Sequence, residues 1–275
     1  MLKTTSFGPV TRFDLARTIP GQGPYWTTCY YVDGLLVDSG CAHARMELAA
    51  ALKDLPLKSI ANTHTHEDHI GANAVLQGQN PQLEIAAHPL ALPVLADPQG
   101  AQPLHPYRRL FWGWPGPSKA RPISNGEIIQ TSQYRLRAVY TPGHSPDHIC
   151  LFEETQGWLF SGDLFVGGQD RALRAGCDIW MIIASLKHIQ TLPVCTLFPG
   201  SARVRQAPQA EIAAKIDYLE DLGKRVIDLR RQGYSVDQIC KTLLGGPMWV
   251  EFVTRGHFSR RWLVRSYLRL YEMGP

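Results

Sequence analysis

The chain has 275 residues, of which 44% are hydrophobic and 19% charged, and its formal net charge is +4. A hydrophobic fraction near one half excludes an intrinsically disordered protein, and no apolar run reaches the roughly 18 residues of a membrane-spanning helix. We therefore expect no membrane partner. Six cysteines are scattered without a CxxC pair, and the first residues hold no signal-like apolar stretch. This pattern predicts a cytoplasmic protein with reduced thiols.

Short apolar runs alternate with helical patterns over the first 200 residues. The runs that are typical of strands lie near residues 29–32, 35–37, 59–61, 83–87, 134–139, 148–152 and 158–160. The pair Asp33-Gly34 between the first two runs predicts a hairpin. Helices are expected at about 42–54, 69–78, 89–96 and 179–191. Strands that alternate with helices predict an α/β layered domain.

The segment 97–123 differs from its surroundings because it holds six prolines and several large aromatic residues. A connection of this length is often functional. Two interpretations stay open from the sequence. The segment is either an ordered lid over a site or a loop packed on the surface.

From about residue 207 the pattern becomes helical. Apolar residues recur at three- and four-residue steps between 212 and 226, and further helices are expected at 235–244 and 258–271. Residues 201–275 carry a net charge of +5, whereas residues 1–200 carry −1. We expect a catalytic domain at 1–206 and a small helical subdomain at 207–275. The charge is too modest to indicate nucleic-acid binding.

The sequence His64-Thr65-His66-Glu67-Asp68-His69 places three histidines and an aspartate within six residues, just after the predicted strand 59–61. On an extended backbone His64 and His66 point to the same side, so both imidazoles reach one ion. Asp68 and His69 follow where a helix would begin, and they reach a second ion. Imidazole with carboxylate suits zinc, iron or manganese.

Two later residues strengthen the metal prediction. His144 lies in a Pro-Gly-His turn before the strand near 148–152, and Asp163 follows the strand near 158–160. Either one alone is weak, since a single histidine or aspartate in a turn is more often a cap or a surface residue. Their order after the histidine motif makes the combination strong.

This set of motifs over residues 20–201 resembles the metallo-β-lactamase superfamily, in particular its glyoxalase II-like hydrolases. The resemblance implies an αββα sandwich with the metals at one edge, followed here by a C-terminal helical extension. It assigns His64, His66 and His144 to a first metal and Asp68 and His69 to a second. By the same resemblance, Asp163 would bridge the two metals. Asp38, which follows the run 35–37, resembles an early strand-end aspartate of the family, and we expect it to be structural.

One position departs from the family pattern. Where the family places a metal-binding histidine, this chain has Ser201 in the turn Phe198-Pro199-Gly200-Ser201. Water or another side chain completes the second site, the second ion binds weakly, or a single ion binds. The candidate substitutes are His148, His188, His257 and Cys195, of which we expect His148 to pack beside the metal turn.

The resemblance implies a hydrolase that uses metal-bound hydroxide on a small ester, thioester or lactone. Asp68 would hydrogen-bond the nucleophile or accept a proton, and Ser201 would orient the water. Zinc is expected, as one or two ions, with iron and manganese as alternatives. The competing hypotheses are a phosphodiesterase or nuclease with the same metals, an iron-dependent sulfur dioxygenase, and a non-catalytic metal-binding sensor.

The expected partner is a small-molecule substrate, and self-association into a homo-oligomer stays open. Five arginines of the C-terminal part either face an anionic substrate or belong to a solvated helix face. They are Arg255, Arg260, Arg261, Arg265 and Arg269.

Overall fold

The computed structural model describes residues 1–17, 25–103, 105–246 and 248–273. Its strands form two large sheets and one small one. The first sheet contains, in spatial order, β1 (Leu2–Phe7), β2 (Val10–Leu15), β3 (Thr27–Val32), β4 (Leu35–Val37), β5 (Ser59–Ala61), β6 (Glu84–Ala87) and β7 (Arg121–Pro122). Its first four strands are antiparallel, whereas β4 to β7 run parallel.

The second sheet pairs its neighbours antiparallel except for β11 and β13, which are parallel. In spatial order it contains β14 (Arg205–Gln206), β13 (Thr196–Pro199), β11 (Trp158–Gly162), β10 (Ile149–Glu153), β9 (Arg135–Tyr140) and β8 (Ile128–Gln130). The small sheet pairs β12 (Leu173–Arg174) with β15 (Phe258–Ser259).

Helices lie between and after these strands. Over the first 200 residues they are η1 (Ala42–Ala44), α1 (Arg45–Leu52), α2 (Asn73–Gln79), η2 (Pro89–Ala91), α3 (Leu92–Ala96), α4 (Pro106–Trp112) and α5 (Ile179–Gln190). The C-terminal part contains α6 (Gln209–Arg231), α7 (Val236–Leu244), α8 (Trp249–Val253) and α9 (Arg260–Met273). No helix in the described ranges is both long and apolar enough to cross a bilayer.

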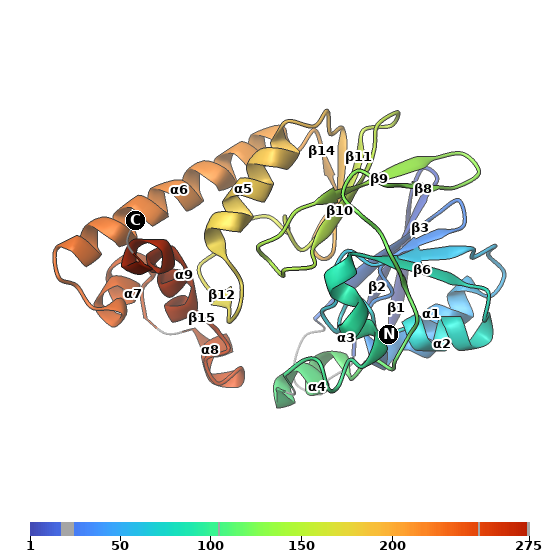
Figure 1. Ribbon diagram of the computed structural model, residues 1–275, viewed down its shortest axis with the longest axis horizontal. Helices are drawn as coiled ribbons and strands as arrows, with labels where there is room; N and C mark the ends of the chain where they lie inside the picture. The colour runs from blue at the N-terminus through green and yellow to red at the C-terminus, as the bar shows by residue number, and fades with distance from the viewer. Residues whose placement is uncertain (18–24, 104, 247, 274–275) are drawn as a thin grey trace.

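The side-chain alternation of the strands builds a four-layer sandwich. In β10, Ile149 and Leu151 belong to a core shared by the two large sheets, whereas Cys150 and Phe152 pack in the core that contains α5. On the opposite side, Leu48 of α1 and Leu76 of α2 pack against the first sheet. The predicted αββα sandwich is thereby confirmed, with helices outside each sheet (Figure 1).

The C-terminal helices are present as expected, and α6 extends beside α5 at the end of the molecule opposite to α1 and α2 (Figure 1). Residues of α6, α7 and α9, such as Leu219, Ile239 and Leu263, share one buried cluster with α5. The division into domains at 206/207 stays a prediction.

Several local predictions agree with the structure. Val32 pairs with Leu35 across the predicted hairpin, and both Asp33 and Gly34 have positive φ, as a type I′ turn requires. The helix expected at 235–244 is α7, and Ser235 caps it in a capping box with Gln238.

The predicted helix start at His69 is wrong, because α2 begins at Asn73. The intervening residues instead bond to the loop after β4. Ser39 N donates to His69 O over 2.7 Å, and Gly71 N donates to Gly40 O over 2.7 Å. A Cβ on Gly71 would lie 2.2 Å from Ala42 N, so only glycine permits this close approach.

Candidate metal centre

The candidate residues all follow the carboxyl ends of strands. Asp38 follows β4, the histidine motif follows β5, His144 follows β9, Asp163 follows β11 and Ser201 follows β13. These strands belong to both large sheets. The sandwich therefore brings residues as far apart in sequence as Asp38 and Ser201 to one edge. Loops at strand ends carry function on a rigid scaffold in many enzymes.

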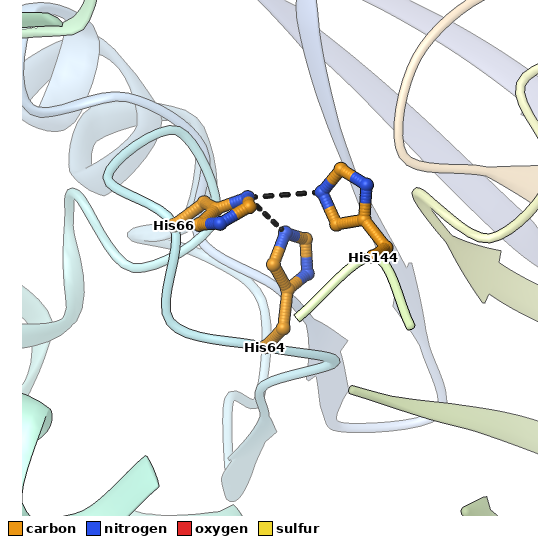
Figure 2. Close-up of side chains that lie close together, drawn as sticks. All are labelled: His64, His66 and His144. Carbon is orange, nitrogen blue, oxygen red and sulfur yellow. Dashed lines mark hydrogen bonds between the residues drawn. The ribbon is translucent and has the colours of Figure 1, made fainter. Parts of the chain in front are cut away.

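Three imidazoles converge as the sequence predicts. His64 Nε2 lies 3.0 Å from His66 Nδ1, and His144 Nε2 lies 2.9 Å from the same atom. Figure 2 shows the three rings turned toward one another, with His144 reaching in from its own turn. One nitrogen from each ring lies within 4.8 Å of the other two, which is the arrangement of three ligands around one ion.

A second group of ligand atoms lies beside the first. It contains His64, His69 and Asp163, whose ligand atoms are again within 4.8 Å of one another. His69 Nε2 is 3.5 Å from Asp163 Oδ1 and 3.8 Å from Asp68 Oδ2. The other oxygen of Asp163, Oδ2, lies 3.5 Å from His144 Nε2. Asp163 therefore lies between the two groups, as a bridging carboxylate would.

The electrostatics of the site fit a bound cation. Burial, followed by the surrounding histidines, lowers the pKa of His64 well below the usual value, so the ring is neutral and offers a lone pair. Burial opposes protonation of His69 as well, but Asp163, Asp38 and Asp68 raise its pKa well above the usual value. Asp163 Oδ1 is buried and accepts no hydrogen bond from the described residues. An orphaned carboxylate oxygen among imidazoles is the donor set that suits a divalent transition metal.

Asp38 has the structural position that was expected. Its Oδ1 accepts a hydrogen bond from Thr63 N over 2.7 Å, and its Oδ2 lies 2.8 Å from His69 Nδ1. Thr63 Oγ1 also lies 3.0 Å from His64 Nδ1. These contacts turn the opposite ring nitrogens of both histidines toward the site, and such partners fix the tautomer of metal-binding imidazoles.

Ser201 lies at the same edge and lines a cavity together with Asp68 and Asp163. The preceding Gly200 leaves no room for a side chain, because a Cβ there would lie 2.6 Å from Asp163 Oδ1. The Pro-Gly turn thus passes directly over the second group of ligand atoms, and a serine follows it.

Among the suggested substitutes for the missing histidine, His148 lies nearest to the histidines of the proposed metal site. Its ring centroid lies 5.1 Å from that of His64, its Nδ1 is 2.9 Å from Thr141 Oγ1, and its buried Nε2 has no partner among the described residues. Burial lowers its pKa to about 3, so the ring is neutral. His188 and Cys195 are exposed, and His257 contacts Tyr107.

A cavity of about 660 Å³ opens above these ligand atoms. Its lining is mainly aromatic and aliphatic and comes from α4, α8 and the segment after Asp163. The segment 97–123 contributes Tyr107, Phe111 and Trp112 through α4, so it lines the site rather than packing elsewhere on the surface.

A buried ion pair that the sequence did not predict connects α4 to the loop of the histidine motif, which follows β5. The guanidinium of Arg108, 2% exposed, binds both carboxylate oxygens of Glu67, which is 1% exposed. Gln102 adds a hydrogen bond from its amide to Thr65 O over 2.8 Å. The only signal in the sequence was an acidic residue placed inside the histidine motif. Its partner is 41 positions away and follows no motif.

Across the cavity, α4 also meets the C-terminal part of the chain. Tyr107 Oη lies 2.6 Å from His257 Nδ1, and the rings of His105 and His257 stack with centroids 3.9 Å apart. Burial lowers the pKa of His257 to about 4, so the ring is neutral at pH 7. Two segments about 150 positions apart thus close one side of the cavity.

Positive charge reaches the cavity from residues other than those expected. Arg174 and Lys215 are among the lining residues. Lys215 pairs with Asp170 at 2.9 Å, whereas Arg174 Nη2 is 3.6 Å from Glu67 Oε2 and makes no hydrogen bond to the described residues. Arg174 thus shares the carboxylate of Glu67 with Arg108 and adds a positive charge to the cavity beside the ligand atoms.

The five C-terminal arginines lie elsewhere. Arg260, Arg261 and Arg265 line a separate hollow. Arg255 is exposed, and Arg269 is an exposed side chain that pairs with Asp178.

Known proteins resemble the chain in sequence. An atrochrysone carboxyl ACP thioesterase from Aspergillus fumigatus is 29% identical over 218 residues, which cover 76% of this chain and 61% of that protein. A hydroxyacylglutathione hydrolase from Legionella pneumophila is 31% identical over 149 residues, 53% of this chain and 49% of that protein. The chain thus spans about half to three fifths of the length of these relatives.

Solved structures resemble it in fold. A metallo-beta-lactamase family protein from Thermus thermophilus gives a TM-score of 0.68 at 19% identity, covering 94% of this chain and 93% of that one. A metallo-beta-lactamase from Pontibacter korlensis gives 0.62 at 18% identity, over 80% and 100% of the two chains. The model of the family described as "Metallo-beta-lactamase superfamily" matches residues 23–201, the range that holds most of the two sheets and all six residues that we assign to metal. The chain therefore belongs to the metallo-beta-lactamase superfamily.

Proposed function

We propose that the chain is a metal-dependent hydrolase that acts on thioesters. The observation that carries this proposal is the convergence of His64, His66 and His144 with His69 and Asp163, in a group of which His66, His144 and Asp163 line one cavity. We assign the first three residues to one ion and Asp68 and His69 to a second, with Asp163 between them. Zinc is the proposed metal, with iron and manganese as alternatives.

A divalent ion held by these residues would supply an activated water and a Lewis acid for the substrate carbonyl. We assign to Asp68 the task of holding that water and accepting its proton, because its carboxylate lines the cavity next to Asp163. In the site without metal, burial raises the pKa of Asp68 to about 6. Ser201 would orient the water through its hydroxyl. The side chains of α4 and α8 that line the cavity would keep other water away from the reacting atoms.

The thioester class is proposed from two considerations. The relatives named above carry thioesterase and hydroxyacylglutathione hydrolase names, and both names denote thioester substrates. The cavity offers Tyr107, Phe111, Trp112 and Trp249 to an apolar acyl group. Arg174 offers a positive charge to an anionic group on that acyl part.

Elemental analysis of protein purified without added metal, joined to hydrolysis assays, tests the proposal. We expect one or two zinc ions per chain and faster cleavage of S-lactoylglutathione or an acyl-pantetheine thioester than of bis(p-nitrophenyl) phosphate. Preference for the phosphodiester would favour a nuclease instead. One iron per chain with oxygen uptake on a persulfide would favour a dioxygenase, and metal without any turnover would favour a sensor. Cytoplasmic location and a homo-oligomer remain part of the proposal, to be tested by cell fractionation and light scattering.

A further inference from the structure

A second hollow lies on the C-terminal helices, separate from the cavity of the metal centre. It measures about 690 Å³ and is formed by residues of α7, α8 and the beginning of α9. Four basic and two acidic side chains line it. The basic residues are Lys241, Arg260, Arg261 and Arg265, and the acidic ones are Asp237 and Glu251.

The charges in this hollow are only partly compensated. Arg261 pairs with Asp237 at 2.6 Å. Arg260 is 7% exposed, and its nearest carboxylate atom, Glu251 Oε1, is 4.0 Å from Nε. Glu251 Oε1 already accepts a hydrogen bond from the backbone nitrogen of Arg260. Arg260 Nε and Nη1 are buried without a hydrogen-bond partner among the described residues.

A buried guanidinium with unsatisfied nitrogens is costly unless an anion completes it. Guanidinium groups donate charge-assisted hydrogen bonds to the oxygens of phosphate. Lys241 and Arg265 add exposed positive charge around the same hollow. This combination is what a phosphate group needs.

The helix α8 joins this hollow to the metal centre. Trp249, Val250 and Val253 line the metal cavity, whereas Glu251 and Phe252 line the basic hollow. At 100° per residue these two sets occupy opposite sides of one helix. An α-helix with side chains is about 10–12 Å across, which is the thickness that separates the two spaces.

We propose that the basic hollow binds the phosphate of a pantetheine-type thiol carrier, while the acyl end of the same thioester lies in the metal cavity. The inference rests on the proposed thioesterase activity. A pantetheine chain is long enough to pass over α8, and it places the phosphate and the sulfur at its two ends. Coenzyme A and a phosphopantetheinylated carrier protein present this same chemistry.

Binding of 4′-phosphopantetheine and of pantetheine to the metal-loaded protein, measured by titration calorimetry, tests the hollow without turnover. We expect the phosphorylated compound to bind at least about tenfold more tightly, as charge-assisted hydrogen bonds to one phosphate allow. The double variant Lys241→Gln/Arg265→Gln, both exposed positions, and the variant Arg260→Met should each reduce this preference. Arg269→Gln, an exposed arginine of the same helix outside the hollow, should retain it.

Equal affinity for the two compounds, or a preference unchanged in the Lys241→Gln/Arg265→Gln protein, overturns the inference. Hydrolysis of an acyl-pantetheine thioester separates this result from the proposed function. Turnover with no phosphate preference leaves the thioesterase proposal intact and removes the phosphate site. A phosphate preference without turnover does the reverse. The same acyl group on coenzyme A and on an acyl carrier protein then identifies the carrier, by which of the two loses more kcat/KM in the double variant.

Discussion

Single residues behind the ligands set how the proposed metal centre is held. Asp38 contacts His69 and the backbone of Thr63, and it is itself 2% exposed. The structural role of Asp38 was predictable from its place after the run 35–37. Its partner His69 was not predictable, because it lies 31 positions away. The histidine motif could be predicted as a metal site because its four proposed ligands are neighbours in sequence. Two partners of that motif, Asp38 and Arg108, come from other parts of the chain.

Changing Asp38 to Asn should weaken metal binding. The amide keeps an oxygen for Thr63 N but cannot accept from His69 Nδ1 with a full negative charge, so the imidazole becomes a poorer ligand. Loss of such a partner lowers metal affinity by about 10–100-fold. Competition with a zinc chelator measures the affinity. Asp14→Asn, on β2 beside Arg12, is the matched control and should bind metal as the wild type does. An unchanged zinc affinity in Asp38→Asn would show that the contact is incidental.

Ser201 is the residue at which the chain departs from its family, and its replacement by histidine should strengthen the second site. An imidazole at this position adds a nitrogen beside Asp163 and Asp68, next to the turn that Gly200 permits. We expect Ser201→His to bind a second ion more tightly than wild type in elemental analysis and in titration with zinc. Ser201→Ala should leave the ion count as it is. If the histidine variant matched the alanine variant in both measurements, position 201 would have no part in the metal site.

At the scale of elements, a buried ion pair connects α4 to the loop of the histidine motif. The sequence left the segment 97–123 open between a lid and a surface loop because prolines and aromatic residues fit both. The pairing of Arg108 with Glu67 holds α4 in place, so that this segment forms a wall of the cavity. Seven strands and the Asp-Gly hairpin were predictable because their signals are local, whereas β1, β2, β7, β8 and β12 to β15 were not predicted. The start of α2 was not, since it depends on contacts of Gly71 with the loop after β4.

Arg108→Met should destabilise the protein strongly. Removing one partner leaves the carboxylate of Glu67 buried with weak compensation from Arg174, and breaking a buried pair costs about 3–5 kcal/mol. Urea unfolding followed by tryptophan fluorescence measures the loss. Arg109→Met, the exposed neighbour on the same helix, should change the free energy of unfolding by less than about 0.5 kcal/mol. Adding Glu67→Gln to Arg108→Met should recover part of the stability. Equal effects of the two arginine variants would contradict this account.

At the scale of the whole molecule, the proposed metal centre joins the two sheets. His64, His66 and His69 follow a strand of the first sheet, whereas His144 and Asp163 follow strands of the second. The αββα fold was predictable from the alternation of strands and helices together with the resemblance. The cavity was not, because it is lined by α4 and α8, which are far apart in sequence, and the five-residue α8 has no clear pattern in the sequence.

Because its ligands come from both sheets, a bound metal should stabilise the folded chain as a whole. A ligand that binds only the native state adds about 4 kcal/mol when its free concentration is about 1,000 times Kd. For a chain of this size, each kcal/mol raises Tm by roughly 2 °C or more. We expect removal of metal by a chelator to lower Tm by about 8 °C in differential scanning calorimetry, and added zinc to restore it. In His144→Ala the chelator should have a much smaller effect, whereas His188→Ala, an exposed histidine on α5, should respond as the wild type does. A wild-type Tm that does not move with chelator would mean that no metal links the two sheets.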